Sequence, residues 1–301
     1  MKILVTGSNG LLGQKLIEKL SKKMDVLATA RGDNRLPFKE NYSFASLDIT
    51  DKNNVDEVFN EFKPDVVIHG AAMTNVDQCE IEKEECWKLN VLATEYLLEA
   101  AKKHNSFFLH VSTDFIFDGK EGPYAEDGIP NPVSFYGWSK YAAEKLVMHS
   151  GVKWAIARTV LVYGIAHDMS RSNIILWVKN SLENGKSINV VNDQWRTPTL
   201  AEDLADGCIL IAEQKAEGIF NISGKDLLNP YEMATMTADY FNLDKKLINE
   251  VDGSQFKQTA KRPAKTGFIL DKAIHKLGYK PKSFKEGIAF LAAQLQKESM
   301  I

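Results

Sequence analysis

Residues 1–13 read MKILVTGSNGLLG. The apolar run from Lys2 to Gly7 predicts a buried β-strand, and Gly7, Gly10 and Gly13 form a G-x-x-G-x-x-G pattern at the start of a predicted helix. Glycine permits a sharp turn, lets the backbone approach a pyrophosphate and allows close packing of helix on strand. The free N–H groups at the helix N-terminus face the phosphate charge. This stretch therefore predicts the dinucleotide-binding corner of an α/β fold.

The rest of the first half alternates short apolar strands with helical patterns. Strands are predicted at 25–30, 43–47, 65–72, 106–113 and 153–160. Helices are predicted at 11–23, 55–62, 80–103 and 134–148. Near-continuous apolar strands separated by helices indicate parallel pairing with both sheet faces covered. The sequence therefore predicts a doubly wound, Rossmann-like parallel sheet.

The second half is less regular. Its predicted helices are 172–183, 199–214, 230–241 and 283–297, and its predicted strands are 188–191 and 218–222. We expect residues 1–165 to form the NAD(P)-binding domain, with segments around 187–222 returning to it, and residues 166–301 to form a smaller C-terminal α/β substrate lobe. Ligands usually bind in clefts between such units, beyond the carboxyl ends of the strands.

Composition narrows the class of protein. The chain has 301 residues, 44% of them hydrophobic and 26% charged, which is typical of an ordinary globular protein. Its net charge of −3 gives no cationic field for nucleic acid or a membrane. Three cysteines show no metal-ligand spacing, so we expect free thiols and no metal site. The N-terminal apolar run is too short for a signal peptide or a membrane span, so the expected location is the cytoplasm.

The second predicted strand ends at Ala30, where an acidic residue would bind a ribose 2′-hydroxyl, and Arg31 follows instead. A guanidinium there favours the 2′-phosphate of NADP(H), although Asp33 leaves NAD(H) possible. Asp48, after the third strand, could accept from the adenine amino group or cap the helix that begins near Thr50.

Two Tyr-x-x-x-Lys pairs occur, Tyr136/Lys140 and Tyr141/Lys145. Spacing i, i+4 places both members of a pair on one helix face, but the second pair is turned about 140° from the first. Only one pair can face the cleft. Tyr136 follows a Pro-Asn-Pro turn at the helix start, so we select Tyr136/Lys140.

A tyrosine hydroxyl has a reference pKa of about 10, and we expect the Lys140 ammonium to lower the pKa of Tyr136 toward neutrality. Thr113, at the end of the fifth predicted strand, could hold a substrate oxygen against Tyr136 by a hydrogen bond. A strand-end hydroxyl bonded to the backbone is the alternative role for Thr113.

The blocks TGSNGLLG, STDFIFDG, PYAEDGIPNPVSFYGWSK, ARTVLVYG and VVNDQWRTPT resemble the extended short-chain dehydrogenase/reductase superfamily. Within it, the chain is most similar to the dTDP-4-dehydrorhamnose reductases. The resemblance runs from Met1 to about Ala205, with a weaker match at 261–263. It implies NAD(P)H-dependent reduction of the 4-keto group of a nucleotide-linked deoxysugar, namely dTDP-4-dehydro-L-rhamnose to dTDP-L-rhamnose.

The resemblance also implies roles for individual residues. The implied catalytic set is Thr113, Tyr136 and Lys140, with Lys140 also holding the nicotinamide ribose. The implied cofactor-binding residues are Gly7, Gly10, Leu11, Leu12, Gly13, Arg31, Asp48, Ile49, Ala71, Ala72, Met73, Tyr136 and Lys140. The implied substrate-binding residues are Thr113, Asp114, Asn173, Asp193, Gln194 and Arg262. Arg262 suits a diphosphate, with a surface salt bridge as the alternative.

Other readings stay open. The family often has Ser-Trp where this chain has Val160-Leu161, which leaves the identity of the sugar open. Another nucleotide-sugar epimerase or dehydratase of the superfamily is one alternative. A non-enzymatic regulatory subunit, like that of methionine adenosyltransferase, is the other. A homodimer is possible.

Overall fold

A seven-stranded parallel sheet forms the centre of the protein, in the order β10-β6-β5-β4-β1-β2-β3. The computed structural model describes residues 1–168, 173–256 and 258–298. The strands of this sheet are β1 (Lys2–Thr6), β2 (Asp25–Ala30), β3 (Ser43–Ser46), β4 (Val66–His69), β5 (Phe107–Thr113), β6 (Trp154–Thr159) and β10 (Gly218–Asn221). The doubly wound α/β fold predicted from the sequence is confirmed. Strand order reverses between β1 and β4, which is where such sheets bind ligands.

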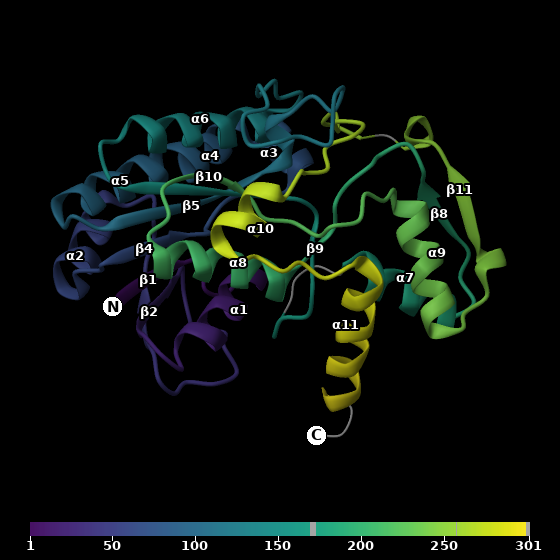
Figure 1. The fold of residues 1–301 in the computed structure, drawn as a ribbon, viewed down its shortest axis with the longest axis horizontal. Helices are drawn as coiled ribbons and strands as arrows, with labels where there is room; N and C mark the ends of the chain where they lie inside the picture. Colours follow the sequence, from purple (N-terminus) through teal and green to yellow (C-terminus); the bar gives the residue numbers. More distant parts are fainter. Residues whose placement is uncertain (169–172, 257, 299–301) are drawn as a thin grey trace.

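Helices cover both faces of the sheet (Figure 1). One face carries α1 (Leu11–Leu20), α8 (Ala201–Gln214) and α10 (Asp271–Leu277), and the other carries α2 (Lys52–Phe62), α5 (Ala93–Lys103) and α6 (Phe135–His149). Alternate residues of each strand enter opposite cores, so that Ile3 and Val5 pack toward α1 while Leu4 packs toward α2. This alternation explains why the strands are apolar throughout.

The prediction of one continuous helix over 80–103 is wrong, because the structure divides this segment into several helical pieces. It consists of α3 (Val76–Ile81), α4 (Lys83–Trp87), a π-helical turn (Lys88–Leu92) and α5. The π turn includes Asn90, whose side chain accepts a hydrogen bond from the Met73 N–H at 2.8 Å and donates one to the Met73 carbonyl at 3.1 Å. Hydrophobic periodicity does not report this contact, since Asn90 and Met73 lie on different elements.

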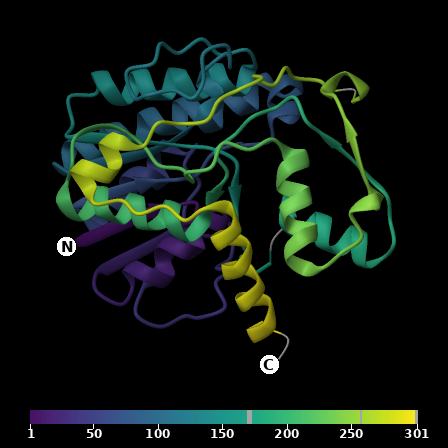
Figure 2. The ribbon, with the colours of Figure 1, turned by 45° about the vertical axis from the view of Figure 1, so that its right-hand side comes forward.

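A smaller unit lies beside the sheet, on the right of Figures 1 and 2. Its helices α7 (Ile174–Glu183) and α9 (Pro230–Phe241) pack on a two-stranded parallel sheet of β8 (Ile188–Val191) and β11 (Ile248–Val251). A second short pair is formed by β7 (Val162–Tyr163) and β9 (Thr199–Leu200). The remaining elements are α11 (Phe284–Glu298) and the 3₁₀ turns Asp114–Ile116, Lys245–Leu247 and Gly253–Gln255.

Of the segments around 187–222, α8 packs on the large sheet and β10 pairs within it, whereas β8 pairs with β11. A four-residue apolar run carries no information about its pairing partner, so the sequence did not distinguish the two sheets. The helix α10 packs on the first unit although it lies late in the chain. Ser172, placed in a predicted helix, lies outside the described residues. Over the described ranges, no helix is long and apolar enough to cross a membrane.

A buried ion pair joins α6 to β6. The Arg158 guanidinium donates to both carboxylate oxygens of Glu144, at 3.0 and 2.8 Å, and to the Glu126 carbonyl at 3.0 Å. Both charged side chains are almost fully shielded from solvent, with exposures of 2% for Arg158 and 0% for Glu144. Each charge therefore depends on its partner for compensation.

Replacing one member of this pair leaves the other buried and uncompensated. We expect Arg158→Met to lower the free energy of unfolding by about 3–5 kcal/mol, and the double variant Glu144→Leu/Arg158→Met to recover most of that loss. Urea unfolding measures both. The matched control is Lys179→Ala, which removes the exposed pair with Glu183 and should cost less than about 1 kcal/mol. A double variant as unstable as the single one would contradict this account.

Candidate active site

The glycine-rich turn brings three backbone segments into contact. Gly7 has a φ of +74°, and the Gly10 N–H donates to the Gly7 carbonyl at 2.9 Å. A Cβ on Gly13 would lie 2.2 Å from the Gly7 carbonyl oxygen, and a Cβ on Gly7 would lie 2.9 Å from the Ala71 nitrogen. Both positions therefore require glycine, one to let α1 meet the turn and the other to let β1 meet the end of β4.

A cavity of about 440 Å³ opens beside this turn, at the carboxyl ends of β1, β2 and β4. Its volume lies within the range of small-molecule sites. Ten of the predicted cofactor-binding residues line it, namely Gly7, Gly10, Leu11, Leu12, Gly13, Arg31, Asp48, Ile49, Ala71 and Ala72. Gly10 precedes α1 without a side-chain cap, so the first N–H groups of that helix have no side-chain cap acceptor. This lining fits the phosphate and adenosine parts of a dinucleotide.

Asp48 does not cap α2. Its carboxylate accepts from the N–H and the hydroxyl of Thr50, at 2.9 and 2.7 Å, while Asp51 caps the helix through the N–H groups of Asn53 and Asn54. The hydrogen bond from the Thr50 hydroxyl holds the pKa of Asp48 below its usual range. A carboxylate therefore borders the cavity where the sequence predicted an adenine contact, and that contact stays a prediction.

The two Tyr-x-x-x-Lys pairs occupy different environments. Lys140 is buried, and its Nζ donates to the Val111 carbonyl at 2.8 Å and lies 3.1 Å from His110 Nε2. Burial lowers the pKa of Lys140 to about 8. Lys145 is exposed, and its Nζ lies 4.6 Å above the Tyr141 ring. Tyr141 and Lys145 therefore contact each other on the outer part of the helix.

Tyr136 is 8% exposed and packs among Met73, Cys79 and Cys86, with its ring 5.7 Å from that of Phe115. Burial raises the pKa of Tyr136 above its usual value, and the neighbouring Thr113 hydroxyl acts in the opposite direction. The expectation that Lys140 lowers this pKa is not met, because burial dominates and the ammonium is bonded to β5. Tyr136, Lys140 and Thr113 are not among the residues that line the cavity. Met73, which packs in the same cluster as Tyr136, lies in the chain between the lining residues Ala72 and Thr74.

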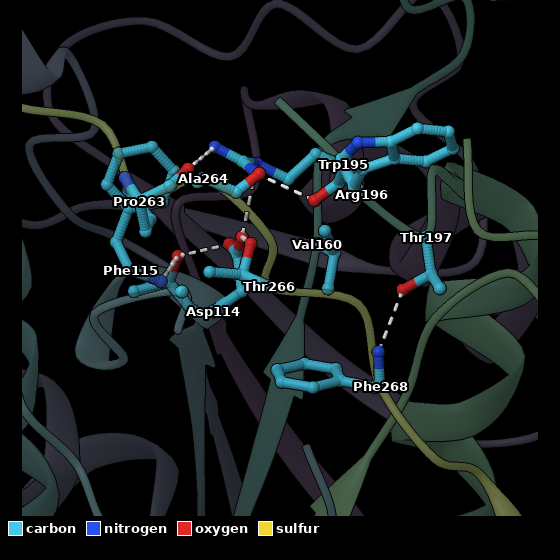
Figure 3. A network of polar contacts seen from close by, with 12 residues as sticks. Asp114, Phe115, Val160, Trp195, Arg196, Thr197, Pro263, Ala264, Thr266 and Phe268 are labelled. Atoms are coloured by element: carbon cyan, nitrogen blue, oxygen red, sulfur yellow. Dashed lines mark hydrogen bonds and ion pairs between the residues drawn. The ribbon is translucent and has the colours of Figure 1, made fainter. Parts of the chain in front are cut away.

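Asp114 belongs to a buried polar network (Figure 3), and Thr113 contacts it. The Thr113 hydroxyl donates to Asp114 at 3.1 Å and accepts from the Phe115 N–H at 3.2 Å. Asp114 also accepts from the Thr266 hydroxyl and lies 3.6 Å from the Arg196 Nε. Burial raises the pKa of Asp114, although the nearby guanidinium opposes this. Asp114, predicted to bind substrate, is thus buried, and its hydrogen bond with Thr266 connects the end of β5 to that residue.

Arg196 contacts several members of this network. Its guanidinium donates to the backbone carbonyls of Trp195 at 2.7 Å, Pro263 at 2.7 Å and Ala264 at 3.3 Å. Arg196 was not among the predicted site residues, although it lies in the VVNDQWRTPT block. Asn90, His69 and His110 were not predicted to belong to the site either. A buried polar residue within an apolar segment was the available signal for His69 and His110.

The other predicted substrate residues lie around the smaller unit. Asn173 caps α7 and donates to the Gly164 carbonyl at 2.7 Å, and Asp193 accepts from the Gly253 N–H at 2.9 Å. The Arg262 guanidinium forms two hydrogen bonds to Asp77, at 2.7 and 2.6 Å, which is the salt-bridge alternative.

Gln194 is partly buried. Leu161, two residues after the end of β6, is 43% exposed and has a φ of +33°. Contacts of all these residues with a substrate stay predictions.

Comparison with known proteins identifies the family. The model of the RmlD substrate binding domain matches residues 1–297. The chain belongs to this family. It is 33% identical to a dTDP-4-dehydrorhamnose reductase of Aggregatibacter actinomycetemcomitans, over 97% of this chain and 98% of the relative. It is also 33% identical to the methionine adenosyltransferase 2 subunit beta of Xenopus tropicalis, over 80% of this chain and 72% of that protein.

A solved structure of an RmlD-family reductase has the same fold. It is the dTDP-4-dehydrorhamnose reductase of Bacillus anthracis in complex with NADP, which superposes with a TM-score of 0.86 at 27% identity and covers 97% of this chain and 99% of that one. The resemblance that the sequence motifs indicated is therefore confirmed.

The close approach at Gly13 yields a prediction for this RmlD-family chain. We expect Gly13→Ala to weaken NADPH binding by about tenfold or more, because the new methyl group forces α1 away from the Gly7 carbonyl. Fluorescence titration measures the affinity. Gly70→Ala is the matched control, since its methyl would enter the same cavity wall with its nearest neighbour at 3.4 Å. Unchanged binding by Gly13→Ala would show that the turn does not shape the site.

Proposed function

We propose that this protein uses NADPH, with NADH as a possible substitute, to reduce the 4-keto group of a nucleotide-linked deoxysugar. The proposed reaction converts dTDP-4-dehydro-L-rhamnose to dTDP-L-rhamnose. The observation that carries the proposal is the placement of Tyr136 and Lys140 on one face of α6, with Thr113 beside Tyr136 and the cavity one residue beyond Met73. Reductase relatives that align over nearly the whole chain support it.

The chemistry needs one hydride and one proton. NADPH, when bound, supplies the hydride that the sugar C4 accepts. The Tyr136 hydroxyl donates the proton to the former keto oxygen, so that a secondary alcohol forms. Because burial raises the pKa of Tyr136, the hydroxyl is protonated at neutral pH, which is the form a proton donor requires. Lys140 donates from its ammonium to the nicotinamide ribose.

The Thr113 hydroxyl donates to Asp114 at 3.1 Å and lies beside Tyr136. We propose that Thr113 positions the phenol, which then donates its proton to the substrate oxygen. The catalytic roles of Thr113, Tyr136 and Lys140 are supported by their proximity and burial.

The two Tyr-x-x-x-Lys pairs provide a matched test of the mechanism. We expect Tyr136→Phe to lower kcat by about 10²–10⁴-fold, because only the proton donor is removed, while NADPH affinity is nearly kept. Tyr141→Phe, in the pair where Lys145 lies over the ring, should leave kcat almost unchanged. Steady-state kinetics and NADPH titration separate the two effects. Similar kcat values for the two variants would refute the assignment of Tyr136.

Arg31 is exposed and borders the cavity, which supports its predicted contact with the 2′-phosphate of NADPH. We expect Arg31→Ser to raise the KM for NADPH by about tenfold and to leave the KM for NADH unchanged. Arg35→Ser is the control, because Arg35 lies outside the cavity lining and is 3.9 Å from Asp168. An equal effect on both cofactors would remove Arg31 as the selecting residue.

The function itself is tested by following NADPH oxidation with a panel of nucleotide-linked 4-keto sugars. Stoichiometric consumption of NADPH with formation of the alcohol supports a reductase. Product formation without net NADPH consumption indicates an epimerase. Tight NADPH binding, no turnover of any sugar and copurification with a methionine adenosyltransferase would favour the regulatory role of the beta-subunit relatives.

Two further features remain proposals. We place the protein in the cytoplasm, which agrees with the free thiols of Cys79, Cys86 and Cys208. We also propose that it can form a homodimer.

A further inference from the structure

The ammonium of Lys140 is held on the side that faces the sheet. Its Nζ donates to the Val111 carbonyl at 2.8 Å and lies 3.1 Å from His110 Nε2. His110 and Lys140 are 1% and 3% exposed, so water does not compete for this contact. A lysine ammonium has three donors and no acceptor. Two of the three N–H groups are therefore engaged by neighbouring residues of β5, and one remains for a ligand.

The contact determines the protonation state of His110. Because an ammonium cannot accept a hydrogen bond, His110 Nε2 must be the acceptor, and the single proton of the neutral ring lies on Nδ1. Burial lowers the pKa of His110 well below its usual value, and the adjacent Lys140 charge adds to this effect. His110 therefore remains an uncharged acceptor throughout the neutral pH range.

The groups around Lys140 do not provide a substitute acceptor. Glu144 of α6 is engaged by Arg158 of β6, and Cys86 contributes a thiol from α4. Asp114 lies beyond Thr113 and acts on Tyr136. Over the described residues, His110 is thus the one side chain that accepts a hydrogen bond from Lys140.

His69, on β4, packs beside His110. The ring centroid of His69 lies 5.3 Å from that of His110. His69 Nδ1 is 2.8 Å from the Thr6 hydroxyl oxygen, and Nε2 is 3.1 Å from that of Thr94. Burial lowers the pKa of His69 to about 3, so it is neutral as well. Thr94 therefore stabilises the neighbour of His110 without touching Lys140.

We propose that His110 is a positioning residue, which together with the Val111 carbonyl orients the Lys140 ammonium so that its third N–H faces the NADPH ribose and Tyr136. The inference rests on the proposed function for its catalytic consequence. The cofactor contact can be measured without any sugar substrate. A hydrogen bond to the ammonium also favours the charged form, so loss of this acceptor should lower the pKa of Lys140 below about 8.

The test compares His110→Phe, which keeps a ring but removes the acceptor, with His110→Gln, which supplies a carbonyl oxygen near the position of Nε2. NADPH affinity is measured by fluorescence titration as a function of pH. For the unaltered protein we expect affinity to fall as pH rises through about 8, because Lys140 loses its charge. His110→Phe should bind NADPH about tenfold more weakly near that pH and shift the midpoint down by about one pH unit. His110→Gln should restore most of the NADPH affinity and return the pH midpoint most of the way to that of the unaltered protein.

Thr94→Val is the structural control. It removes a bond to His69, so it should lower the Tm and leave the pH midpoint of NADPH binding unchanged. An unchanged midpoint and affinity in His110→Phe would overturn the proposal, even if its Tm falls. The alkaline limb of kcat/KM for a 4-keto sugar should shift with the binding midpoint. If no sugar is reduced while the binding midpoint still shifts, the proposed function fails and the positioning role of His110 stands.

Discussion

The site depends on a backbone contact that leaves no room for side chains. The carbonyl of Gly7 lies where a Cβ on Gly13 would be, and the end of β4 lies against Gly7 at a distance that excludes a Cβ there as well. The same contact brings the start of α1, the end of β1 and Ala71 to one cavity. A dinucleotide can therefore approach the main chain, and it meets amide groups in place of side chains.

A similar close approach positions the proposed catalytic groups. A Cβ on Gly137 would lie 2.2 Å from the Phe115 carbonyl oxygen, so the first turn of α6 rests directly on the turn that follows Thr113. This contact places Tyr136 beside Thr113 and buries it, and burial keeps the phenol protonated. Lys140, one turn later, is buried against β5, where acceptors keep its ammonium in place. Burial thus keeps the phenol protonated but lowers the pKa of Lys140, so the ammonium depends on its acceptors on β5.

Arginine side chains join the smaller unit to the region around Thr113 and Tyr136. Their hydrogen bonds and ion pairs are formed with other groups of the protein. The Arg196 guanidinium donates hydrogen bonds to three backbone carbonyls and lies 3.6 Å from Asp114, while Arg262 forms an ion pair with Asp77. These contacts connect the segment around 260–266 to the end of β5 and to α3. Residues that family resemblance assigns to substrate binding therefore also support the loops around the site. The two roles are compatible, since a site that binds a flexible nucleotide sugar needs fixed walls.

Local patterns in the sequence determined the sheet class, the glycine-rich corner and the placement of Tyr136 and Lys140 on one helix, because strand alternation, turn chemistry and i, i+4 spacing act over a few residues. Ten of the predicted cofactor-binding residues reach one cavity for that reason. Tertiary structure alone decided that β8 pairs with β11, that Arg262 binds Asp77 and that His110 accepts from Lys140. These contacts join residues far apart in the chain, where neither periodicity nor spacing indicates the partner. Burial by the assembled fold also set the pKa values of Tyr136 and Lys140.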